Sequence, residues 1–180
     1  MNFTSLGAKI LDDFVQKAIY GDKEAFISAI DKCTPILYKL GYKLGMNDED
    51  TGDAMQDTIL AAYEKIWTLK NPEYFKTWLI RIFINRCNSI RKKNKKIISI
   101  DNLKETMSVN DRDHNDNQEL NEAINNLSYD YKTVIVLYYI MGFTIKEMCS
   151  ILDKKEGTIK SQLSRARNEL RKFYKVSEEA

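Results

Sequence analysis

The sequence predicts an all-α protein: two small helical-bundle domains joined by a flexible linker, with a helix-turn-helix in the C-terminal domain. Three observations lead to this prediction. The 180 residues include only 7 Gly and 2 Pro, too few for the many turns of a β fold. Apolar residues recur at spacings of three and four in both halves of the chain. A polar stretch without such a period separates the halves.

The first half is expected to form three helices. The first carries an apolar stripe made of Phe26, Ile30, Cys33, Leu37, Leu40 and Leu44. Pro35 interrupts this stripe, and because proline lacks an N–H we expect a kink or a break near Thr34. Gly45 followed by Asn47 and Asp48 predicts the end of this helix and a new N-cap.

The second helix is expected over residues 48–67. Its predicted core-facing residues are Met55, Ile59, Ala62 and Ile66. A short loop containing Asn71-Pro72 leads into a third helix over residues 74–95. The apolar side of this third helix holds Leu79, Ile80, Phe83, Cys87 and Ile90.

The opposite side of the third helix gathers polar, basic and aromatic residues, namely Thr77, Trp78, Arg81, Asn85, Asn88 and Lys92. Such a face suits partly opened DNA, because bases stack on aromatics, amides bond base edges and cations hold the backbone. Trp78 alone allows another interpretation, since an aromatic near a helix start often packs against its neighbour.

A connector follows over residues 97–117, rich in Ser, Asn and Asp. Its segment DRDHNDN shows no period, so we expect a flexible tether. Beyond it, four helices are expected over residues 119–127, 129–141, 144–152 and 156–174. Very short turns join them, which indicates a compact bundle.

Residues 144–171 give the strongest local signal. A short helix with one apolar face (Ile145, Met148, Cys149, Leu152) is followed by a turn of three residues and a second helix. One side of the second helix holds Ile159, Leu163, Ala166, Leu170 and Phe173. The rest carries Lys160, Ser161, Ser164, Arg165, Arg167, Asn168, Arg171 and Lys172. A helix with one dry side and one cationic, hydrogen-bonding side suits the major groove. The alternative is a merely amphipathic C-terminal helix.

Charge is distributed unevenly although the net charge is only +2. Residues 81–96 carry seven basic side chains and no acidic one, and residues 154–175 carry eight against Glu156 and Glu169. The stretch between them, residues 101–122, is strongly acidic. This pattern predicts two DNA-contacting modules; either patch alone is equally compatible with a solvated helix face.

Several function classes are disfavoured. Three separated cysteines, one histidine (His114) and no Cys-x-x-Cys pair predict buried thiols in the cytoplasm and neither metal nor cofactor. No apolar run approaches the ~20 residues that cross a bilayer, and the N-terminus lacks the pattern of an export signal. The absence of a Gly-rich phosphate loop and of a nucleophile–base pair predicts that the protein is not an enzyme and has no small-molecule substrate.

Five segments together resemble the extracytoplasmic-function sigma factors of the sigma-70 family. They are GDKEAF (21–26), DAMQDTI (53–59), FKTWLIRIFINRC (75–87), LSYDYKTVIVLYYIMGFT (127–144) and EGTIKSQLSRARNEL (156–170). The resemblance covers nearly the whole chain apart from about ten N-terminal residues and the tether. It implies a region 2 domain over residues 10–95, a linker over 96–117 and a region 4 domain over 118–176.

The resemblance also implies roles for particular residues. The polymerase-binding surface would comprise Asp53, Gln56, Asp57 and Leu60. The loop at residues 69–73 and the helix after it would read and melt the −10 element. A base would be flipped from the stack, and the contacts would come from Trp78, Arg81, Asn85, Asn88 and Lys92. The −35 element would be read as duplex by Thr158, Lys160, Ser161, Ser164, Arg165, Arg167 and Arg171.

The function implied is that of an alternative sigma factor, which binds core RNA polymerase and directs initiation at specific promoter DNA. Such factors usually await release by an anti-sigma factor, often membrane-anchored. A stand-alone helix-turn-helix regulator is the alternative; it explains the C-terminal half only.

The sequence departs from the family pattern in the turn and in the second helix of the motif. Asp153 stands where glycine is usual, and because Asp tolerates a left-handed conformation we expect the turn to form. Lys154 replaces an apolar turn residue, which predicts looser packing there. Gln162 and Ser164 replace larger or basic residues, and Ile59 replaces an aromatic.

Overall fold

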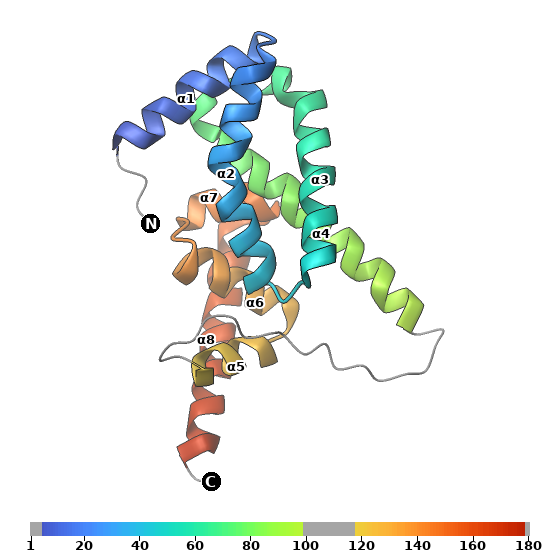
Figure 1. Cartoon of the computed structure of the whole chain (residues 1–180). Helices are drawn as coiled ribbons and strands as arrows, with labels where there is room; N and C mark the ends of the chain where they lie inside the picture. The colour runs from blue at the N-terminus through green and yellow to red at the C-terminus, as the bar shows by residue number, and fades with distance from the viewer. Residues whose placement is uncertain (1–4, 99–117, 179–180) are drawn as a thin grey trace. The chain divides into compact units, whose positions relative to one another are not determined.

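The computed structural model describes the backbone of residues 5–98 and 118–178 and the side chains of residues 7–94 and 120–173 (Figure 1). Every regular element in these ranges is a helix, which confirms the predicted fold class. The chain divides into two compact units: Met1–Tyr42 with Met46–Asn102, and Lys43–Gly45 with Leu103–Ala180. Of the predicted linker, residues 99–117 lie outside the described ranges. None of the described helices combines the length and apolar character that a membrane crossing needs.

The helices of the N-terminal unit are, in order, α1 (Ser5–Ile19), α2 (Lys23–Lys43), α3 (Asp48–Lys65), the 3₁₀ turns η1 (Ile66–Thr68) and η2 (Pro72–Tyr74), and α4 (Phe75–Ile98). Sequence periodicity did not predict α1, whose buried residues are Leu11, Val15 and Ala18. Helix α4 continues to Ile98, three residues beyond its predicted end.

Helix α2 runs through Pro35, so the alternative of a break near Thr34 is wrong. All six residues of its predicted apolar stripe are buried. Each such side chain contributes about 1.5–3 kcal/mol on burial, so the stripe on both sides of the proline outweighs the ~3 kcal/mol that an internal proline costs. The Thr34 hydroxyl donates to the carbonyl oxygen of Ile30 at 3.1 Å.

Two of the residues predicted to face the core from the helix over residues 48–67, Ala62 and Ile66, are buried, but the rest of the buried face of α3 differs from the predicted one. Its buried residues are the small side chains Thr51, Ala54, Thr58, Ala61 and Ala62. Met55 and Ile59, which were predicted to face the core, are half-buried. The reason is close packing of α3 on α4 and, at its N-terminal end, on α2, where a Cβ at Gly41 would lie 2.7 Å from Thr51 Cγ2. Only small side chains fit such an interface, so the bulkier ones lie at its edge.

Helix α4 contributes Phe75, Leu79, Ile80, Phe83 and Cys87 to the core. The side-chain amide of Asn94 donates to Asp50 Oδ2 at 3.1 Å, which ties the later part of α4 to the start of α3. Ile90, predicted on the same apolar side, is only half-buried.

Two of the three cysteines belong to this core. Burial raises the pKa of Cys33 to about 11 and that of Cys87 to about 12. Both thiols therefore stay protonated at neutral pH and act as small apolar side chains. The third, Cys149, is half-buried rather than buried.

The C-terminal unit contains α5 (Gln118–Asn126), α6 (Tyr129–Ile135), the π-helical segment η3 (Val136–Ile140), α7 (Ile145–Leu152) and α8 (Glu156–Glu178). The predicted helix over 129–141 thus ends as a wider turn, in which the Met141 N–H bonds the Val136 carbonyl at 2.9 Å. Gly142, at φ +73°, then reverses the chain toward α7.

Candidate nucleic-acid interface

Helix α7, the first helix of the predicted helix-turn-helix, begins at a capping box. Thr144 Oγ1 accepts from the Glu147 N–H at 3.3 Å, and Glu147 Oε2 accepts from the Thr144 N–H at 2.8 Å. Both contacts satisfy N–H groups that a helix start leaves without an intrahelical partner. The apolar side of the helix then packs through Met148 and Ile151, both buried.

The turn between α7 and α8 is short and well defined. Asp153 adopts a left-handed conformation (φ 54°, ψ 44°), as the sequence predicted. The Lys154 N–H donates to the Cys149 carbonyl at 3.3 Å, and the Lys155 carbonyl accepts from the N–H groups of Thr158 and Ile159. The three residues between Leu152 and Glu156 therefore set the angle at which α8 leaves the turn.

Helix α8 has the two faces that its sequence predicted. Ile159, Leu163 and Ala166 are buried, while Leu170 and Phe173 are half-buried. The residues predicted to contact the −35 element are all exposed: Thr158, Lys160, Ser161, Ser164, Arg165, Arg167 and Arg171. Four cations on one exposed helix face form a surface that attracts phosphate.

Two of these side chains already have partners. Lys160 Nζ lies 2.6 Å from Glu156 Oε1, and this hydrogen bond, together with the charge of the carboxylate, raises the pKa of Lys160. The same contact lowers the pKa of Glu156. Ser161 Oγ donates to the Thr158 carbonyl at 2.9 Å. A phosphate at Lys160 therefore competes with Glu156.

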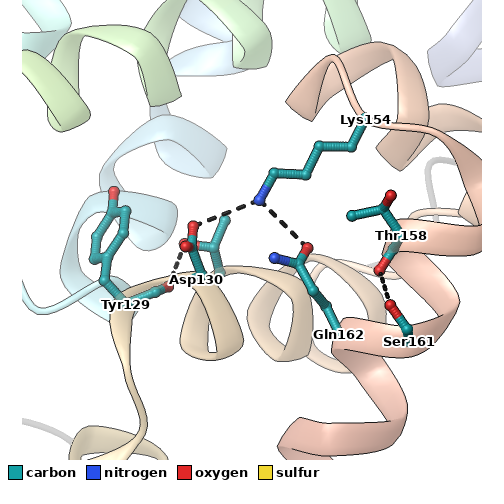
Figure 2. Close-up of polar contacts among 7 residues, drawn as sticks. Tyr129, Asp130, Lys154, Thr158, Ser161 and Gln162 are labelled. Atoms are coloured by element: carbon teal, nitrogen blue, oxygen red, sulfur yellow. Dashed lines mark hydrogen bonds and ion pairs between the residues drawn. The ribbon is translucent and has the colours of Figure 1, made fainter.

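Lys154 forms polar contacts that sequence reasoning did not anticipate (Figure 2). Its ammonium lies 3.5 Å from Asp130 Oδ1 on α6 and 3.3 Å from Gln162 Oε1 on α8. We call these three side chains the Lys154 clasp. Lys154 and Gln162 are two of the departures from the family pattern, and they contact each other.

The predicted DNA-facing side of α4 is less exposed than its sequence suggested. Asn85 and Lys92 are exposed, whereas Thr77, Trp78, Arg81 and Asn88 are half-buried. The Trp78 ring lies 6.0 Å from that of the buried Phe75, centroid to centroid, so it is partly committed to packing, as the alternative interpretation held. The loop before the helix is mixed: Lys70, Asn71 and Glu73 are exposed, and Leu69 and Pro72 are half-buried.

The predicted polymerase-binding residues form one exposed face of α3, made of Asp53, Gln56, Asp57 and Leu60. Two exposed aromatics that sequence reasoning missed follow Leu60 in the chain: Tyr63 on α3 and Trp67 in η1, which are 45% and 72% exposed. The spacing of Tyr63 from Leu60, at plus three, could have revealed it. An exposed apolar ridge of this kind, with an acidic rim, is typical of a protein-binding surface.

Comparisons with known proteins show which family this chain matches. Residues 29–97 match the family model of sigma-70 region 2, and residues 117–170 match that of sigma-70 region 4. The sigma factor SigV of Bacillus subtilis is 30% identical over 145 residues, which are 80% of this chain and 87% of SigV. The ECF sigma factor SigW of the same organism is 30% identical, with 84% and 90% covered. The chain belongs to the extracytoplasmic-function group of the sigma-70 family.

Solved structures show the same fold. The sigma factor RpoE of Bartonella quintana, in complex with the anti-sigma factor NepR, is 28% identical, with a TM-score of 0.69 over 84% of this sigma factor and 97% of RpoE. CnrH, in complex with the cytosolic domain of CnrY, is 20% identical and has a TM-score of 0.69 over 93% and 98% of the two chains. The second likeness concerns the fold alone.

Proposed function

We propose that this sigma factor seats on core RNA polymerase and directs it to promoters with two separate elements. In this proposal residues 10–95 act as the region 2 domain, residues 118–176 as the region 4 domain, and residues 96–117 as the linker. Tethering two weakly binding units raises the effective concentration of the second once the first is bound. The proposal depends above all on the exposed cationic face of α8 behind a defined three-residue turn.

The −35 element is read as duplex by α8. The buried Ile159, Leu163 and Ala166 dock this helix on the bundle, which leaves the opposite face free for the major groove. Arg165 is exposed and can pair with a guanine edge, and Ser161 and Ser164 beside it can bond bases or phosphates. Arg167 and Arg171 extend the face along the helix and neutralise backbone phosphates.

The −10 element is captured as unpaired strand by α4 and the loop before it. Asn85 is exposed at the centre of the face, where its amide can bond a base edge, and Lys92 is exposed further along for the backbone. Arg81 and Asn88 lie on the same side but half-buried, which suits contacts to a base inserted against the helix. Trp78 packs on Phe75, so its role is to form the wall of such a site.

The acidic and apolar face of α3 binds the polymerase. Asp53, Asp57 and Leu60 are exposed together, so a basic and apolar surface on the enzyme would complement them. An anti-sigma factor regulates the protein by covering such surfaces in the cytoplasm; support comes from the sigma factor RpoE, which was solved in complex with the anti-sigma factor NepR.

The test is transcription in vitro. Purified protein is added to sigma-free core polymerase from Bacillus subtilis with genomic template from the source organism, and transcript starts are mapped. We expect new starts that share two sequence elements at a constant separation. Starts identical to those of core enzyme alone refute the proposal, and DNA binding to a palindrome without polymerase would favour a stand-alone regulator instead.

A further inference from the structure

We propose that Lys154 is a positioning residue, which fixes the rotation of the DNA-reading helix α8 by joining it to α6 through the Lys154 clasp. This inference rests on the proposed function of α8 at the −35 element. It assigns a specificity role to a turn residue that does not itself need to contact DNA.

The backbone of Lys154 is held before its side chain reaches out. The preceding Asp153 is left-handed, and the Lys154 N–H bonds the Cys149 carbonyl at 3.3 Å. The side chain is 30% exposed, so most of its surface is covered. A fixed backbone and a largely covered side chain restrict where the ammonium can lie.

The ammonium forms a polar link between α6 and α8, two helices that also pack on each other. Asp130 lies in the first turn of α6, and its Oδ1 is 3.5 Å from Lys154 Nζ. Gln162 lies in the second turn of α8, and its Oε1 is 3.3 Å from the same nitrogen. Figure 2 shows the nitrogen between the two oxygens. An ammonium has three N–H donors and no acceptor, so it can serve both partners at once.

The clasp explains two departures from the family pattern together. A basic residue at position 162 would repel the ammonium of Lys154, whereas the Gln162 oxygen accepts from it. An apolar residue at position 154 would leave both Gln162 and Asp130 without this donor. Each of the two residues is therefore suited to the presence of the other.

The position of Gln162 makes this contact matter for recognition. Gln162 follows Ser161 directly and lies one helical turn before Arg165, two of the side chains proposed to face DNA. The packing of the buried Ile159 and Leu163 already limits rotation of α8 about its axis. A hydrogen bond is directional, and one at the edge of the dry face resists that rotation.

A simpler role for Lys154 would be a direct phosphate contact, and the two roles differ in their consequences. Under a direct contact, removing Asp130 frees the ammonium and strengthens DNA binding. Under the clasp, removing Asp130 loosens α8 and lowers the discrimination between sequences. Lys155, the next residue in the turn, is exposed and carries the same charge, so it supplies a matched control.

The experiment uses holoenzyme assembled from the full chain and core polymerase. Wild-type holoenzyme first selects its upstream element from duplexes with a randomised −35 region. Selectivity is then the ratio of affinities for the selected duplex and a scrambled one, measured for Lys154→Met, Asp130→Ala, the double variant and Lys155→Met. Thermal melting of each free protein is followed in parallel.

We expect Lys154→Met and Asp130→Ala each to lower selectivity by about fivefold, and the double variant by no more than either. Lys155→Met should keep the wild-type ratio. Because exposed ion pairs contribute little to stability, melting temperatures should change by no more than about 2 °C. Lys154→Arg, which keeps a cation of similar reach, should retain the ratio.

Each other outcome overturns the inference in a distinguishable way. If Lys154→Met and Lys155→Met have the same selectivity ratio while wild-type holoenzyme still prefers its selected duplex, the positioning role of Lys154 is refuted and the proposed function is not. Stronger binding by Asp130→Ala with unchanged selectivity assigns Lys154 to a phosphate instead. A fall in selectivity that follows a large loss of melting temperature makes the clasp merely structural. If wild-type holoenzyme selects no upstream element, the proposed function itself fails, and the positioning role fails with it.

Discussion

Replacing Gly41 by alanine tests the close helix packing that sets the two functional faces of the N-terminal unit. A Cβ at this position would lie 2.7 Å from Thr51 Cγ2, 3.0 Å from Thr51 Oγ1 and 3.3 Å from Phe83 Cζ. Thr51 is buried and β-branched, so its side chain has little freedom to move away. The substitution therefore pushes apart α2, α3 and α4 where they meet.

The size of the effect follows from two opposing contributions. Overpacking a core by one methyl group costs about 1–3 kcal/mol, and alanine gains about 1 kcal/mol over glycine inside a helix. We expect Gly41→Ala to lower the free energy of unfolding by up to about 2 kcal/mol. Gly52→Ala is the matched control, because nothing lies within 4 Å of its Cβ position. It should raise the free energy of unfolding by about 0.5–1 kcal/mol.

Denaturant unfolding followed by tryptophan fluorescence measures this difference in one unit of the protein. Both tryptophans of the chain, Trp67 and Trp78, belong to the N-terminal unit, so the signal is free of the C-terminal unit. Adding Thr51→Ala to Gly41→Ala removes the two closest atoms and should recover part of the loss. A Gly41→Ala protein as stable as Gly52→Ala would contradict the packing described here.

Three further predictions concern the proposed contacts. Arg165→Ala should weaken binding of holoenzyme to the upstream promoter element by ~1–3 kcal/mol in an equilibrium assay. The control, Lys172→Ala, should lower the affinity for every DNA sequence slightly and to the same extent. Unchanged affinity for Arg165→Ala would argue against the docking of α8. Asn85→Ala should reduce open-complex yield by about fivefold in permanganate footprinting while initial binding is kept, and equal yields would count against its role in strand capture. Asp53→Lys should weaken assembly with core polymerase by about tenfold or more, as measured by fluorescence anisotropy. Asp31→Lys on α2 is the control. Normal assembly of the Asp53→Lys protein would place the polymerase-binding surface elsewhere.

Local signals in the sequence predicted the helix-turn-helix well. The turn depends on Asp153 and its neighbours, and the dry face depends on the spacing of Ile159, Leu163 and Ala166 within one helix. Such features are fixed by residues close together in the chain, so periodicity and turn chemistry reveal them.

Features that depend on distant residues were predicted less well. The face of α3 is set by its packing on α4 and, at Thr51, by the approach of Gly41 on α2. Helix propensity at Pro35 is overridden by the core that α2 covers. The partners of Lys154 lie 24 residues before it and 8 after it. No local pattern in the sequence encodes those contacts, because they arise only when the helices pack. The roles assigned to DNA-facing and polymerase-facing residues stay predictions.

The most direct test of the two-element account changes the distance between the elements. At a promoter mapped with holoenzyme, five base pairs are inserted between the upstream and downstream elements, which turns one away from the other by about half a helical turn. Run-off transcription is measured on the native and on the lengthened template, in each case with core enzyme alone and with holoenzyme. If both units read the promoter together, holoenzyme should initiate strongly on the native template and at near-background level on the lengthened one. Equal initiation on the two templates would contradict joint recognition by two units seated on polymerase.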